Sequence, residues 1–140
     1  MRIFLDTNVF LRYFTKDDRE MYDAVEELLL SATESKIHLA TSTVVLTEIM
    51  YTLKSFYKQN NSRIQQHIDS ILEITNLVLL DKTNFKQAYT LHKKRNVKIS
   101  DCLIATQVPE SYKLCSFDND LEKIIGKNRF ITPGKVLSQI

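Results

Sequence analysis

Four acidic side chains fall where a parallel sheet would bring them together. Asp6 ends an apolar, strand-like run, and Asp118 follows a second such run at residues 112–117. Glu48 lies in the second turn of a helix that follows a further short strand, and Asp101 opens another helix. Ligands of open parallel sheets bind outside the carboxyl ends of the strands, so these acids are candidates for chemistry.

The type of these residues indicates which chemistry they would support. If the carboxylates converge in a partly dehydrated cleft, proton uptake or a divalent cation must relieve their repulsion. Oxygen ligands without cysteine or paired histidine favour magnesium or manganese over zinc, and such ions activate water and neutralise phosphate leaving groups. Cys102 and Cys115 lie in apolar segments, where we expect reduced core thiols. The pattern favours a magnesium or manganese centre that acts on phosphates.

Each acid also has a structural interpretation, which the sequence leaves open. Asp6 and Asp118 would serve as caps of the helices that follow them, and Asp118 also suits an Asx turn. Glu48 lies opposite the apolar stripe of its helix, where glutamate is usually solvated. Asp101 is harder to explain in this way, because three- and four-residue steps from it reach the inward-facing apolar positions. Ser100 is the better cap of that helix.

The elements that must position these acids alternate between strands and helices. A continuous apolar run such as Leu77–Leu80 predicts a strand buried on both faces, as in a parallel sheet between helices. We therefore expect one α/β domain over residues 1–140, a three-layer sandwich with a mainly parallel central sheet. The expected strands are 2–5, 37–40, 77–80, 112–117 and an edge strand at 129–131, and the longer helical segments are 18–32, 46–57, 64–72, 85–92, 103–108 and 119–125.

Composition excludes several other classes of protein. The chain has 140 residues, 44% of them hydrophobic and 26% charged, which is ordinary for a globular domain. Its two glycines cannot form a Walker loop or a dinucleotide fingerprint. No apolar stretch approaches the length of a membrane span, and Asp6 interrupts the short apolar start, so we expect no membrane segment or signal peptide. This favours a cytoplasmic protein.

The basic residues are unevenly distributed. The net charge is only +2, yet six bases and no acid lie between Asp81 and Asp101. Such a run is either a solvated helix face or a patch for a polyanion such as a nucleic-acid backbone. Four of its members are candidates for RNA contact: Lys93, Lys94, Arg95 and Lys98.

Four segments resemble the PIN-domain ribonucleases, especially the bacterial VapC-type toxins. Residues 1–13, Met-Arg-Ile-Phe-Leu-Asp-Thr-Asn-Val-Phe-Leu-Arg-Tyr, are similar to the opening of that family. Residues 99–107 resemble its third acidic motif, and Ser116-Phe117-Asp118 resembles its Ser/Thr-x-Asp motif. Residues 44–51, which contain Thr47-Glu48, are similar to the helix with the second acid. The likeness extends in order along nearly the whole chain.

The resemblance implies a function and a set of residues. It implies an endoribonuclease in which Asp6, Glu48, Asp101 and Asp118 are the catalytic acids, with Mg²⁺ or Mn²⁺ held by Asp6, Asp101 and Asp118. It further implies that Asn8 supports these acids, and that Ser116 helps to place water or phosphate. Asp120 either shares the role of Asp118 or stabilises the first turn of its own helix.

The resemblance also implies partners. The substrate would be RNA, with transfer or ribosomal RNA expected for a toxin, and the chain would form a homodimer. A toxin of this kind is held inactive by a cognate antitoxin. The alternative, from another functional class, is a catalytically silent PIN-like module that binds RNA or protein.

Overall fold

A computed structural model describes all 140 residues as an α/β sandwich, and this confirms the expected fold class. Its central sheet has five strands, all parallel, in the order β3-β2-β1-β4-β5. The strands are β1 (Arg2–Leu5), β2 (His38–Ser42), β3 (Leu77–Leu80), β4 (Lys113–Cys115) and β5 (Phe130–Ile131). The helices are α1 (Thr7–Thr15), α2 (Arg19–Thr33), α3 (Thr43–Ser55), α4 (Asn61–Leu72), α5 (Phe85–Arg95), α6 (Ile99–Gln107), α7 (Asp120–Ile125) and α8 (Pro133–Ser138), with a 3₁₀ turn at Lys127–Arg129.

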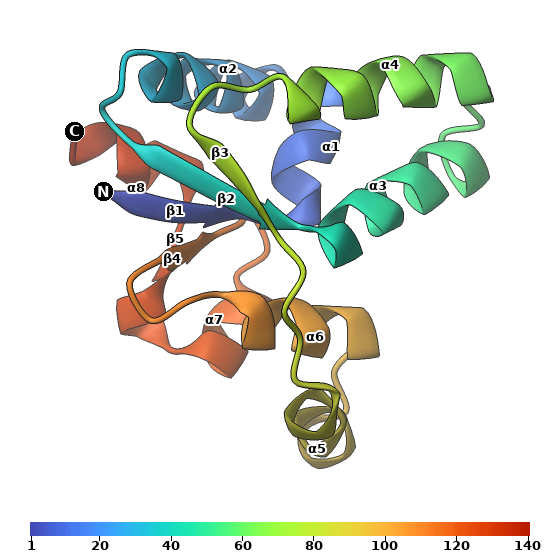
Figure 1. The fold of residues 1–140 in the computed structure, drawn as a ribbon, viewed down its shortest axis with the longest axis vertical. Helices are drawn as coiled ribbons and strands as arrows, with labels where there is room; N and C mark the ends of the chain where they lie inside the picture. Colours follow the sequence, from blue (N-terminus) through green and yellow to red (C-terminus); the bar gives the residue numbers. More distant parts are fainter.

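The first strand forms the centre of the core. Ile3, Phe4 and Leu5 have no exposed surface, because β1 pairs with β2 on one side and β4 on the other. Helices lie on both sides of the sheet, with α1, α2 and α4 above it and α6 and α7 below it in Figure 1. Burial on both faces explains why β1 is a continuous apolar run.

Side-chain caps fix where several helices begin. Asp18 accepts a hydrogen bond from the backbone N–H of Met21 at the start of α2, as Ser42 does from Val45 at the start of α3. Asn60 caps α4 in the same way. Each cap satisfies a backbone donor that the first helical turn leaves free. The separation of the helical segments expected at 46–57 and 64–72 is therefore confirmed.

The burial predicted for Leu77–Leu80 is wrong. These residues form a strand, but β3 is an edge strand in which Val78 is 51% and Leu79 40% exposed. The following helix, α5, packs against α6 instead of covering β3, and it lies apart from the sheet in Figure 1. An apolar run predicts a strand, but its neighbours decide whether both faces are buried.

Two details of the helices also differ from expectation. The N-cap of α6 is Lys98, which makes no side-chain cap bond, and the hydroxyl of Ser100 is buried without a partner. Ser100 therefore lies inside the first turn of α6 and does not cap it. The final helix α8, which begins after Thr132 with Pro133 in its first turn, was not expected. No helix of the structure combines the length and apolar character that crossing a membrane requires.

Two leucines of α2 provide a test of this packing. Leu28 is fully buried and Leu30 is 57% exposed, although they lie on the same helix. We expect Leu28→Ala to lower the free energy of unfolding by about 2–5 kcal/mol, because it leaves a cavity in the core. Leu30→Ala should change it by less than about 1 kcal/mol. Urea denaturation followed by circular dichroism measures both values, and equal losses would contradict the packing of α2.

Candidate active site

Asp6 is a buried carboxylate at the carboxyl end of the central strand. It follows Leu5 directly, is 4% exposed, and its backbone N–H donates to the carbonyl of Cys115 at 3.0 Å. It lies at the N-cap position of α1 but makes no side-chain cap bond, so the capping interpretation does not hold. Its Oδ1 is buried and has no partner with normal hydrogen-bond geometry. One carboxylate oxygen is therefore left without a donor, a costly arrangement in a folded core.

The hydroxyl of Ser116 fixes the other oxygen of Asp6. It donates to Asp6 Oδ2 at 2.8 Å and accepts the backbone N–H of Asp118 at 3.0 Å. Ser116 has no exposed surface, since it follows β4, which lies beside β1 in the sheet. As the side chains lie, this hydroxyl orients Asp6 and does not face solvent.

Asn8 completes this network from the first turn of α1. Its side-chain N–H donates to Ser116 Oγ at 3.0 Å, and its Oδ1 accepts the backbone N–H of Phe117 at 3.1 Å. Asn8 therefore connects the start of α1 to the segment that follows β4. The Asp6 and Asp118 segments, more than 100 residues apart in the sequence, are joined by these hydrogen bonds.

Glu48 and Asp101 approach Asp6 from two further helices. Burial raises the pKa of Asp6 to about 7, with hydrogen bonding from Ser116 and the nearby N–H of Thr7 opposing the rise, and with the charges of Asp101 and Glu48 adding to it. Burial also raises the pKa of Asp101 to about 6, as do the charges of Glu48 and Asp118, while Lys98 opposes the rise. The carboxylates are thus close enough to repel one another.

Glu48 is not the solvated side chain that its place on α3 suggested. Its side chain is 17% exposed, and Oε2 is buried without a hydrogen bond. α3 packs against α6, which turns this side of α3 towards Asp101.

Asp118 and Asp120 have different surroundings although they lie two residues apart. Asp118 Oδ1 accepts the backbone N–H of Asp120 at 2.9 Å, which forms the Asx turn that leads into α7. The negative charge of Asp118 contributes to the raised pKa of Asp101. The side chain of Asp120 is 80% exposed and pairs with Lys123 at 3.2 Å. In this arrangement Asp118 belongs to the acidic cluster and Asp120 lies on the outside of α7.

A divalent cation needs several oxygen ligands, which the acidic cluster could supply. No three of these side chains, as they lie, are close enough to hold a metal ion by themselves. Magnesium nevertheless keeps several waters and needs only one or two direct carboxylates. Asp6 Oδ1 and Glu48 Oε2 are buried oxygens that no donor satisfies, and all the charged groups of the cluster but Lys98 are acidic. The residues fit a hydrated divalent cation.

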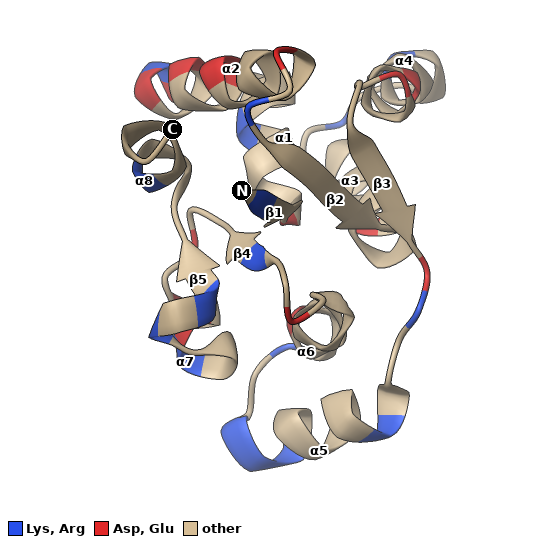
Figure 2. Cartoon of the chain, turned by 60° about the vertical axis from the view of Figure 1, so that its left-hand side comes forward, with Lys and Arg blue, Asp and Glu red and all other residues tan.

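The basic run contributes one side chain to this cluster. Lys98 Nζ lies 3.6 Å from Glu48 Oε2. The other three candidates for RNA contact lie elsewhere on the exposed surface at the end of α5: Lys93 stands over the ring of Tyr89 at 4.7 Å, Arg95 donates to the carbonyl of Lys123, and Lys94 neighbours both. Figure 2 shows this basic end of α5 far from the acidic helix α2.

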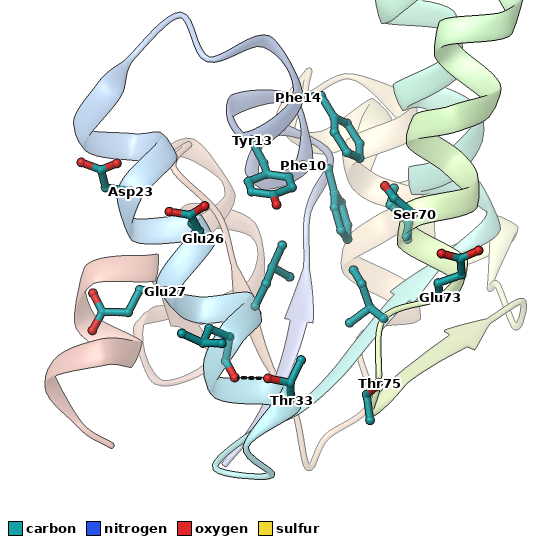
Figure 3. A pocket seen from close by; sticks show the side chains of 14 residues that line it. Phe10, Tyr13, Phe14, Asp23, Glu26, Glu27, Thr33, Ser70, Glu73 and Thr75 are labelled. Atoms are coloured by element: carbon teal, nitrogen blue, oxygen red, sulfur yellow. Dashed lines mark hydrogen bonds between the residues drawn. The ribbon is translucent and has the colours of Figure 1, made fainter.

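A second feature, which the sequence did not suggest, is a groove of about 680 Å³ between α2, α1 and the end of α4. Tyr13 of α1 is half-buried at its base, and the rings of Phe10 and Phe14, 0% and 7% exposed, lie beneath it in the core (Figure 3). Acidic residues of α2 and the end of α4 surround this aromatic floor: Asp23, Glu26, Glu27 and Glu73. In the sequence, the aromatic residues at three- and four-residue steps in α1 could have indicated an aromatic face on this helix.

Comparison with known proteins places the chain in a family. The model of the PIN domain matches residues 3–127, and no curated protein sequence matches. Among solved structures, the chain is similar to one in the VapBC2 complex of Rickettsia felis bound to a promoter DNA fragment, with 22% identity, a TM-score of 0.64 and coverage of 94% of this chain and 97% of that one.

Two further structures have the same fold. A protein of Pyrobaculum aerophilum is 13% identical with a TM-score of 0.67, over 99% of this chain and 88% of that one. A chain of a toxin–antitoxin complex of Klebsiella pneumoniae is 18% identical with a TM-score of 0.60, over 94% and 97%. At these identities the likeness establishes the fold.

The raised pKa of Asp6 predicts how its substitution changes stability. Because the folded-state pKa is about 7 and the unfolded value 3.8, the folded protein loses stability as pH rises through this range. Asp6→Asn removes this loss while keeping an oxygen that accepts from Ser116. The free energy of unfolding of Asp6→Asn, relative to that of the wild type, should therefore rise by on the order of 2–4 kcal/mol between pH 4 and pH 7. Above pH 7 this difference should stay constant.

Urea denaturation at several pH values, with a chelator present, measures this difference. Asp69→Asn is the matched control, because Asp69 is exposed on α4 away from the cluster. A gain that is independent of pH would contradict the burial of an ionisable Asp6.

Proposed function

The chain belongs to the PIN domain family, whose members are nucleases, and from this premise we propose that it is a divalent-metal-dependent endoribonuclease, the toxin of a toxin–antitoxin pair. It would act in the cytoplasm on transfer or ribosomal RNA. The observation that carries the proposal is the partnerless Oδ1 of Asp6, buried where the charges of Glu48 and Asp101 also reach. A core carboxylate in such surroundings costs stability unless a cation compensates it, which supports a site kept for function.

We assign the catalytic roles from this arrangement. Asp6, Asp101 and Asp118 would hold a hydrated Mg²⁺ or Mn²⁺, partly through its bound waters, and PIN nucleases generally use divalent metal ions. When bound, the ion supplies activation of water and neutralisation of phosphate charge. Ser116 keeps Asp6 Oδ2 in place, and Asn8 holds Ser116 and the Phe117 backbone. We assign to the Glu48 carboxylate the role of accepting a proton from a water at the cluster.

The proposal predicts which substitutions abolish cleavage. Asp101→Asn and Asp118→Asn should reduce cleavage of purified transfer and ribosomal RNA by more than about a hundredfold, since loss of a direct ligand exceeds the tenfold to hundredfold loss typical of outer partners. Ser116→Ala should fall within that smaller range. Discrete cuts on denaturing gels, with magnesium, with manganese and with chelator, measure these rates.

Asp120→Asn is the matched control, because it removes an equal charge two residues from Asp118 on the exposed side of α7. Its rate should stay within about twofold of the wild type. Cleavage that survives chelation or Asp101→Asn would contradict the proposed site. Absence of cleavage by the folded protein would instead favour a non-catalytic RNA- or protein-binding module.

The groove supports the proposed antitoxin as a partner. The exposed Leu30 and the half-buried Tyr13 in its lining call for apolar side chains, and its rim carries four acids and no lysine or arginine. Asp23 has a cation partner, Arg19, whereas Glu27 and Glu73 form no ion pair. Complementary charge then specifies an amphipathic antitoxin segment with lysine or arginine beside its apolar residues.

We also propose that the chain forms a homodimer with a second copy of itself. Large apolar side chains are exposed on α3, the edge strand β3 and α5, and they include Tyr51 (73%), Val78 (51%) and Phe85 (59%). Such surfaces are typical of subunit contacts in small proteins. A second copy seated there would also cover the unpaired edge of β3.

Reversing charge at the groove should weaken the antitoxin complex. We expect Glu27→Lys/Glu73→Lys to weaken binding of the proposed antitoxin, the product of the neighbouring gene, by about tenfold or more. Like charges that face each other across an interface cost several kcal/mol. Cleavage by the free variant should not change, since neither residue belongs to the acidic cluster. Calorimetry and protection of RNA from cleavage measure the two effects.

Glu20→Lys/Glu110→Lys makes the same change of net charge outside the groove and should bind as the wild type does. Equal weakening by both pairs would indicate a general charge effect and contradict the groove as the docking site. A neighbouring gene product that neither binds nor protects RNA would contradict the toxin assignment.

A further inference from the structure

Lys98 is the one cation that reaches the acidic cluster, and its geometry is unusual for an ion pair. It stands at the start of α6, three residues before Asp101, and its Nζ lies 3.6 Å from Glu48 Oε2 on α3. No other lysine or arginine forms an ion pair with any of the four acids. The ammonium therefore connects the two helices that carry two of those acids.

The contact compensates the negative charge of Glu48 but forms no hydrogen bond with its carboxylate. At 3.6 Å the two atoms lie beyond hydrogen-bond distance, and Glu48 Oε2 is buried with no hydrogen-bond partner. The Lys98 side chain is 66% exposed and the Glu48 side chain 17%. The lysine can therefore move into solvent on its flexible stem, whereas the glutamate is held in the cluster.

The rest of the basic run does not share this position. Lys93 stands over Tyr89, and Arg95 reaches the carbonyl of Lys123. Both lie on α5, which packs on the far side of α6 from the sheet (Figure 1).

From this geometry we infer that Lys98 is a built-in counter-ion, which balances the charge of Glu48 and opposes binding of the divalent cation to the neighbouring acids. This inference rests on the proposed function, because it concerns the cation of the same site. The ammonium at Glu48 and a cation held by the other acids are two positive charges in one cluster, so they repel each other and binding of the cation drives the ammonium into solvent. Lys98 thus lowers the affinity of the cluster for divalent cations while it protects Glu48 from uncompensated burial.

Metal binding by the whole protein tests the inference without reference to activity. Isothermal titration calorimetry with Mn²⁺ at fixed ionic strength should show that Lys98→Met binds on the order of tenfold more tightly than the wild type. Lys98→Arg, which keeps the charge, should bind as the wild type does. Lys123→Met is the matched control, because Lys123 is also largely exposed, at 76% against 66% for Lys98, and pairs with Asp120 outside the cluster. Its affinity should not change.

A double-substitution cycle assigns the effect to the Lys98–Glu48 pair. In a Glu48→Gln background, Lys98→Met should change Mn²⁺ affinity by less than about twofold, since the competing carboxylate charge is gone. Circular dichroism verifies that each variant is folded. Mn²⁺ binding that is unchanged or weaker in folded Lys98→Met overturns the inference and leaves the proposed metal site intact. No Mn²⁺ binding by the wild type or any variant overturns both.

Discussion

The structure depends on a buried negative charge at the end of its central strand. β1 lies in the middle of the sheet, so the residue after Leu5 emerges inside the protein and not at its edge. Asp6 at this point pays a desolvation cost that an apolar residue would not. The neighbouring hydrogen bonds reduce the cost for Oδ2 and leave Oδ1 unsatisfied. A protein selected for stability alone has no reason to keep such a group.

The parallel topology explains why so many distant residues serve this one position. With every strand parallel, β1 and β4 end at the same edge, and the segments after them meet there. Ser116 and Asn8 connect those two segments by hydrogen bonds, and the Asp118 backbone joins them. α3 and α6 add one acid each from helices that pack together. The cluster is thus a product of chain connectivity more than of any local motif.

Local patterns predicted the elements well, and contacts between elements were the part they could not predict. The apolar run before Asp6 and the apolar stripe of the helix that carries Glu48 predicted the strand and helix around the site, because such patterns are local properties. The exposure of Val78 was not foreseen, since it depends on α5 packing against α6. The near-burial of Glu48 was also missed, because it requires the α3–α6 contact. The place of Glu48 after a predicted strand made it a candidate, and the family resemblance gave it a catalytic role.

One helix couples the two functional features of the molecule. The first turn of α1 carries Asn8, which anchors the segment after β4, and its next turns supply Phe10 and Phe14 to the groove. A partner on the half-buried Tyr13 would therefore contact the helix that follows Asp6. None of the four acids lines the groove, so such a partner would not cover them by filling it. If the proposed antitoxin binds there, its inhibition would act through the position of α1, or through a second segment that extends to the acids.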